Sequence, residues 1–200
     1  VIKPTADLNK GFSGNETKMI RPHGGVLIDR RVSEKEGQRI TENFDEYTLL
    51  EISTEIAQEL YNIAYGVFSP LKGFLVQNQL DSVLSHGRLP DDTPWTIPIV
   101  LDVSSDDIQG VVEGDMVGLV YNGKPTATLE IEEIYEYDKN HFAESVFGTT
   151  DTAHPGVAKV KGMKELLLGG RVRLVQDIGN PYPKYTLRPK ETRILFKEKG

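Results

Sequence analysis

Few side chains in this sequence could bind a metal or act as a nucleophile. There is no cysteine, which excludes disulfides, thiolate catalysis and cysteine-ligated zinc or iron–sulfur sites. His23 stands beside Gly24 and Gly25 and is a candidate ligand, but without a second ligand nearby a turn histidine is the favoured interpretation. The residues therefore predict no metal site.

The stretch Gly148-Thr149-Thr150-Asp151 has two interpretations. A glycine followed by hydroxyl side chains could cradle a phosphate, but the Gly-Lys-Ser/Thr ending of a P-loop is missing. Threonine and aspartate side chains also bond readily to their own backbone, which favours a capped turn. We expect the capped turn and keep the phosphate cradle as the alternative.

The charge balance restricts the class of partner. The formal net charge is −7, and no block of lysine and arginine appears, so nucleic acid is an unexpected partner. The same balance argues against a broad funnel for anions, although it leaves room for a small local anion site. No run approaches the roughly 20 apolar residues of a membrane span, and no signal-peptide pattern is visible. We expect a cytoplasmic protein without a membrane partner.

One helix and the turn after it are the clearest local prediction. Ser53 or Thr54 can cap a helix whose apolar residues recur at the spacing of one face as far as Val67. Gly66 is placed to end it, because glycine adopts positive φ without steric cost. A turn with Pro70 and Gly73 follows.

The remaining pattern indicates an α+β fold with a mostly antiparallel sheet. Asn122-Gly123 predicts a type I′ hairpin, because both residues tolerate positive φ. The absence of alternating strands and helices argues against a doubly wound sheet. Strands are expected at 26–28, 47–52, 95–103, 114–121, 125–137 and 171–175, and further helices at 33–45, around 80–84, at 139–147 and at 189–197.

Separated motifs then indicate a family. Gly66–Phe74 is similar to the G-x-F-S-P-L-x-G-F signature of ATP sulfurylase (sulfate adenylyltransferase), and Gly148–Val157 is similar to its G-T-x-D-x-x-H-P-G-V segment. Pro22–Leu27 resembles the family's P-H-G-G-x-L opening, and Pro189–Phe196 resembles its P-x-x-T/V-R-x-x-F segment. The resemblance runs in the family's order from Pro22 to Phe196.

The resemblance implies the N-terminal domain of ATP sulfurylase, a PUA-like β-barrel with flanking helices. It divides the chain into an N-terminal arm (1–20), this domain (21–187) and the start of a linker or helix toward a catalytic domain (188–200). In the family, that second domain carries Q-x-R-N-P-x-H-x-x-H and G-R-D motifs, which are missing here. We therefore assign no catalytic, substrate-binding or metal-binding residue, and expect these 200 residues alone to be inactive. The intact enzyme would use MgATP.

In the whole enzyme we expect this domain to support the catalytic domain and a homo-oligomer through two contact loops. The candidate contact residues are Phe68, Ser69, Pro70, Gly73 and Phe74 in the first loop, and Thr149, Asp151, His154, Pro155 and Gly156 in the second. Two other functions stay open: a PUA-like RNA-binding module, and a freestanding domain that binds sulfate or a nucleotide. Fold alone does not choose among them.

Overall fold

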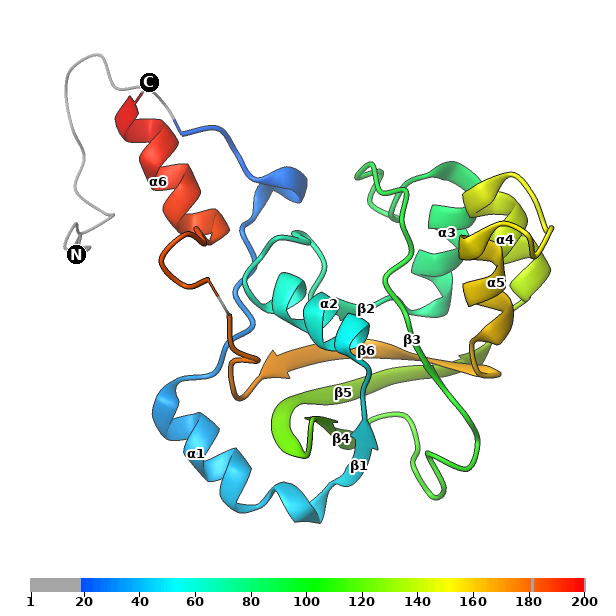
Figure 1. The fold of residues 1–200 in the computed structure, drawn as a ribbon, viewed down its shortest axis with the longest axis horizontal. Helices are drawn as coiled ribbons and strands as arrows, with labels where there is room; N and C mark the ends of the chain where they lie inside the picture. Colours follow the sequence, from blue (N-terminus) through cyan, green and yellow to red (C-terminus); the bar gives the residue numbers. More distant parts are fainter. Residues whose placement is uncertain (1–18, 181, 200) are drawn as a thin grey trace.

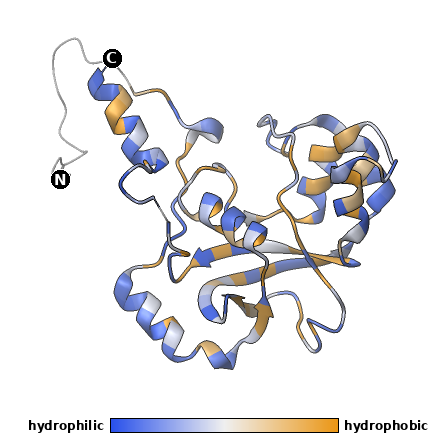
Figure 2. Ribbon diagram, viewed as in Figure 1, coloured by the Kyte–Doolittle hydropathy of each residue, from blue (hydrophilic) through white to orange (hydrophobic). Residues whose placement is uncertain are grey.

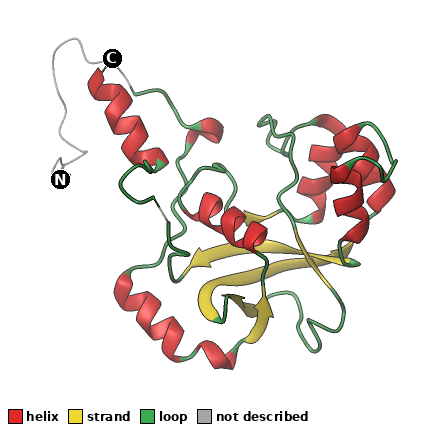
Figure 3. Ribbon diagram, in the orientation of Figure 1, coloured by secondary structure: helices red, strands yellow, loops and turns green. Residues whose placement is uncertain are grey.

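The computed structural model describes residues 19–180 and 182–199 (Figure 1). Apart from Met19 and Ile20, the expected N-terminal arm lies outside the described residues. A central sheet is surrounded by helices, and the last helix stands at the periphery (Figure 3). This arrangement confirms the mixed fold with a mostly antiparallel sheet that the sequence predicts.

The sheet has six strands in the order β1-β4-β5-β6-β2, with β3 also paired to β6. The pairing is antiparallel except between β1 and β4. The strands are β1 (Thr48–Glu51), β2 (Gly73–Phe74), β3 (Leu101–Val103), β4 (Met116–Tyr121), β5 (Lys124–Glu136) and β6 (Leu166–Leu174).

The expected closed barrel is wrong. Strand β6 pairs with β5 along one edge, while β2 and β3 follow one another along its other edge. These two strands contribute only two and three residues, and no described residue joins either of them to β1. The sheet therefore stays open between its outer strands.

The hairpin is confirmed, whereas several strand bounds are not. Asn122 and Gly123 connect β4 to β5 with φ of +52° and +70°, as a type I′ turn requires. The predicted strand at 26–28 is absent, because the Ile28 amide donates to a side chain, the Ser69 hydroxyl, and not to a neighbouring strand. The strand expected at 95–103 is reduced to β3, since Pro98 has no N–H for a ladder. Strand β6 begins before Arg171, the predicted start, and runs through Gly169 and Gly170.

The helices follow their capping residues. The Ser53 hydroxyl accepts the Ile56 amide at 3.2 Å at the start of α2, and Gly66 has φ of +80° just after its end. Helix α5 was not predicted; it begins after a histidine cap described below. The bounds are α1 (Glu34–Glu42), α2 (Thr54–Ala64), α3 (Gln77–His86), α4 (Lys139–Phe147), α5 (Pro155–Gly162) and α6 (Pro189–Lys199).

Helix α2 lies over the sheet and forms the core with β5 and β6, while α3, α4 and α5 gather at one end (Figure 1). Leu60 and Ile63 of α2 are fully buried, as are Leu129 and Val172 of the sheet. Each such side chain stabilises the fold by about 1.5–3 kcal/mol. Helix α1 is mostly hydrophilic, as a solvated helix should be (Figure 2). None of the described helices is both long and apolar enough to cross a bilayer.

Candidate functional site

The first candidate loop is held from within the domain. The Ser69 hydroxyl donates to the Gly66 carbonyl at 2.7 Å and accepts the Ile28 amide at 3.0 Å. Its side chain is buried, so both bonds are shielded from water. Phe74 is buried in the core, and Phe68 packs edge-on against Trp95 at 6.1 Å between ring centroids. The loop is thus a rigid part of the fold.

The other side of the same loop is open. Gly73 pairs with β6 so closely that a Cβ there would clash with the Gly170 carbonyl. Next to this contact, Pro70, Gly73 and Phe74 line a groove of about 570 Å³, together with Lys72 and Arg171. The first loop therefore presents a polar groove to solvent.

The second candidate loop is a capped turn, as the residues predict, and not an empty phosphate cradle. The Thr149 hydroxyl accepts the Asp151 amide at 3.1 Å, and the Asp151 carboxylate accepts the Ala153 amide at 2.9 Å. His154 then caps α5 through Nδ1, which accepts the Gly156 amide at 3.2 Å. Because these amides already have acceptors, they are not available to hold a phosphate.

Packing fixes this second loop as well. The His154 ring stacks on Phe147 with centroids 4.9 Å apart, and Gly156 leaves the space that the Phe147 ring occupies. Pro155 begins α5 directly after the histidine. The two candidate loops are not brought together: one connects α2 to β2, and the other lies at the outer side of the helices α4 and α5 (Figure 1).

His23, the candidate ligand of the sequence, is a packing residue. Its Nε2 donates to the Pro94 carbonyl at 2.8 Å, and its ring lies 6.1 Å from Trp95. Among the described residues, no three histidine or acidic side chains gather as a metal site would require.

A carboxyl group with an unusual pKa lies between α2 and α5. Burial raises the pKa of Glu59 from 4.5 to about 7, with Lys159 lowering and Glu55 raising that pKa to smaller extents. One oxygen of Glu59 is fully buried and has no hydrogen-bond partner among the described residues. Lys159 instead pairs with exposed Glu55 at 2.6 Å, which joins the two helices.

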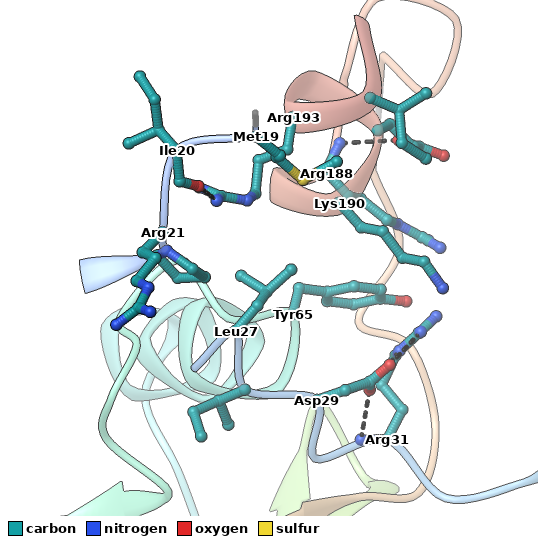
Figure 4. Close-up of a pocket in the computed structure, with 14 residues that line it drawn as sticks. Met19, Ile20, Arg21, Leu27, Asp29, Arg31, Tyr65, Arg188, Lys190 and Arg193 are labelled. Atoms are coloured by element: carbon teal, nitrogen blue, oxygen red, sulfur yellow. Dashed lines mark hydrogen bonds and ion pairs between the residues drawn. The ribbon is translucent and has the colours of Figure 1, made fainter. Parts of the chain in front are cut away.

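A basic cavity that the sequence does not predict separates α6 from the rest of the domain. Its volume is about 510 Å³, and residues 19–31, Tyr65 and the first half of α6 surround it (Figure 4). Leu27 and Ile194 contribute apolar walls. The cationic residues around it are Arg21, Arg31, Arg188, Lys190 and Arg193. In a chain of net charge −7, this is a local reversal of sign.

Tyr65 fastens the segment before α6 to the domain. Its hydroxyl donates to Asp177 at 2.7 Å, while the guanidinium groups of Arg188 and Arg31 lie 4.1 and 4.8 Å from its ring centroid. Arg188 also pairs with Asp177 at 3.3 Å, and Arg31 pairs with Asp29 at 2.5 Å. Partial burial and the bond to Asp177 raise the pKa of Tyr65 to about 12, so the phenol stays protonated and keeps donating.

Comparison with known proteins places this fold. The model of the PUA-like domain family matches residues 20–177, most of the chain. The chain belongs to the PUA-like domain family. The fold of this PUA-like domain is similar to that of a solved structure, a hexameric APS kinase from Thiobacillus denitrificans, with a TM-score of 0.69 and 22% identity. That match covers 92% of this chain and 32% of the kinase chain.

Three curated relatives with higher sequence identity than the kinase are all named sulfate adenylyltransferase. This chain is 52% identical over 180 residues to the sulfate adenylyltransferases of Hyperthermus butylicus and Thermococcus onnurineus, and 40% identical over 181 residues to that of Chloroflexus aurantiacus. Each match covers 90% of this chain but only 46%, 47% and 45% of the relative. The chain thus spans about half the length of the curated relatives it matches.

Proposed function

We propose that this PUA-like domain is the N-terminal half of a sulfate adenylyltransferase, which joins sulfate to the α-phosphorus of MgATP to give adenosine 5′-phosphosulfate and pyrophosphate. The observation that carries the proposal is 52% identity across 90% of the chain to relatives of that name. Those relatives are about twice as long, which supports a division of labour between two halves.

In this proposal the second half holds the reaction centre and MgATP. Bringing two anions together requires cationic side chains, backbone amides and Mg²⁺ aimed at the reacting groups. The motifs that supply them in the family are missing from this sequence, and the amides of its threonine-rich loop already have partners. Residues 21–187 would then be the supporting domain, and 188–200 the connection to the second half.

The role of the domain would be to position the catalytic half and to help assemble a homo-oligomer. The candidate contact residues are those of the two loops that border the open groove or lie in the turn before α5. Pro70 and Gly73 border the open groove, while Thr149 is half-buried and Asp151 exposed in the turn before α5. Because both loops are rigid, they could bind a partner surface at low cost in conformational entropy.

A pyrophosphate-release assay with sulfate and MgATP tests the assignment. We expect no turnover above a protein-free control for the 200-residue chain, and turnover for a longer polypeptide that continues it with the second half found in the relatives. Inactivity of the folded longer polypeptide would contradict the enzyme assignment. Turnover by the short chain would contradict the division of labour.

A further inference from the structure

Helix α6 is held to the domain differently from the other helices. Helices α1 to α5 each bury at least two residues, whereas α6 buries none. Short helices in proteins are stabilised mainly by burying an apolar face. In the hydrophobic stretch of α6 (Figure 2), Ile194 and Leu195 are only half-buried, and the exposed fraction of Phe196 is 67%.

Exposed apolar side chains are concentrated around this helix. Among the described residues, ten large hydrophobic side chains are exposed, and six of them lie at positions 20–26 and 182–196. The two segments meet where the Arg193 guanidinium donates to the Ile20 carbonyl (Figure 4), while Val26 lies farther along, in the groove of the first loop. Clustered exposure of this kind marks an interaction surface, whereas single exposed residues are ordinary.

The charges that line the cavity beneath α6 indicate which kind of side chain could bind there. Its two carboxylates are already engaged: Asp29 binds Arg31, and Glu191 accepts the backbone amide of Arg188. Among the described residues neither Arg21 nor Lys190 takes part in an ion pair. The cavity thus has apolar walls and five cationic lining residues against two acidic ones, which suits an apolar side chain flanked by acidic ones.

We propose that α6 and residues 19–27 are the surface on which the second half of the polypeptide docks, with an acidic and apolar segment seated in the basic cavity. The inference rests on the proposed function. It adds a specific surface that meets the first contact loop only where Gly24 and Val26 line the groove of that loop. The second half is a suitable occupant because it would be covalently linked to this domain, and a linked segment binds at an effective concentration in the millimolar range.

A second copy of this chain is a less suitable occupant. In a two-fold dimer the same patch faces itself, so Arg21 and Lys190 would meet the same cations of the partner. Like charges in that arrangement oppose association. The relatives, in contrast, each extend beyond the matched region by about the length of this chain again, which is enough for a second domain.

Hydrogen exchange on the longer polypeptide and on the 200-residue chain tests the inference. We expect backbone amides of 19–27 and 189–196 to exchange at least about tenfold more slowly in the longer polypeptide, because docking suppresses local opening. Amides of β5 and β6 should exchange equally in both and serve as the internal control. Equal exchange of 19–27 and 189–196 in the two polypeptides would overturn the inference.

Two substitutions at exposed positions locate the contact. In the longer polypeptide, Lys190→Glu and Phe196→Ser should each return these amides to the exchange rates of the short chain. Lys124→Glu, at the exposed first residue of β5, and Val112→Ser, at a side chain that is 60% exposed, are matched controls that should change nothing. Loss of protection with the controls, or its retention with both test variants, would count against this surface.

The outcomes separate the docking surface from the proposed function. A longer polypeptide that makes adenosine phosphosulfate without protecting 19–27 and 189–196 would overturn the docking inference alone. Protection without turnover would support the surface and contradict the enzyme assignment. A dimer of the 200-residue chain in light scattering, dissociated by Phe196→Ser, would identify a second copy as the occupant and overturn the inference.

Discussion

At the scale of single residues, Glu59 is the group whose protonation should affect stability most clearly. Its carboxyl has a pKa raised to about 7 by burial, against an ordinary value of 4.5. An acid with a raised folded-state pKa holds its proton more tightly in the native state than in the unfolded state. Native stability therefore falls as the pH rises from 4.5 through 7, and the penalty is complete above that range.

We expect Glu59→Gln to remove this dependence, because glutamine does not ionise. The variant should match the unsubstituted protein near pH 4.5 and be more stable at pH 8, by at most about 3 kcal/mol. Urea unfolding at the two pH values measures the difference. Glu42→Gln, at an exposed position of α1, is the control. A Glu59→Gln effect of equal size at both pH values would contradict the prediction.

Gly73 is a position where a single methyl group should matter. A Cβ there would overlap the Gly170 carbonyl of the neighbouring strand, so β2 could not stay paired as it is. We expect Gly73→Ala to lower the free energy of unfolding by about 1–3 kcal/mol. Gly162→Ala in α5 is the matched control, since a Cβ there meets no atom within 4 Å. Thermal unfolding that ranks the two variants in the opposite order would refute this account.

At the scale of elements, the Ser69 hydroxyl accepts the Ile28 amide in the segment 26–28, where the sequence predicts a strand paired with a neighbouring strand. We expect Ser69→Ala to destabilise the domain by about 1–3 kcal/mol, because the Ile28 amide would lose its acceptor in a buried position. Faster hydrogen exchange at Ile28 should accompany the loss. Ser85→Ala on the exposed side of α3 should be nearly neutral. An unchanged exchange rate at Ile28 would show that the hydroxyl does not hold this segment.

The elements that could be predicted are those whose signals lie within a few residues. Ser53 and Gly66 bound α2 by their own chemistry, and Asn122 with Gly123 determines its hairpin. Helix α5 was missed because its cap is a histidine, whose role depends on Phe147 packing beside it. The open sheet was missed because β2 and β3 are defined only by their partner β6.

At the scale of the whole molecule, the charge distribution argues against the RNA-binding alternative. The net charge of −7 repels a phosphate backbone, and the one basic cavity described has only five cationic lining residues. We expect no salt-dependent binding of a structured RNA at micromolar protein, as measured by fluorescence anisotropy. Binding that weakens with salt and disappears in Lys190→Glu would restore the RNA-binding module.

The candidate loops could be predicted from the sequence, whereas the cavity could not, because it is formed by segments that are far apart in the chain. Each loop is a continuous stretch, so its turn residues and its resemblance to a family can be read together. The cavity joins Ile20 to Arg193, which are 173 residues apart. Its cations are scattered in the sequence, so no basic block appears, and only the fold brings them together.

The position of β6 in the chain affects how the protein is made. Strands β2, β3 and β5 all pair with β6, yet β6 is the last strand of this sheet to leave the ribosome. Until Leu166–Leu174 emerge, the nascent chain carries unpaired strand edges that favour aggregation. Messages truncated before that point should therefore yield insoluble fragments, whereas those ending after β6 should release a foldable domain.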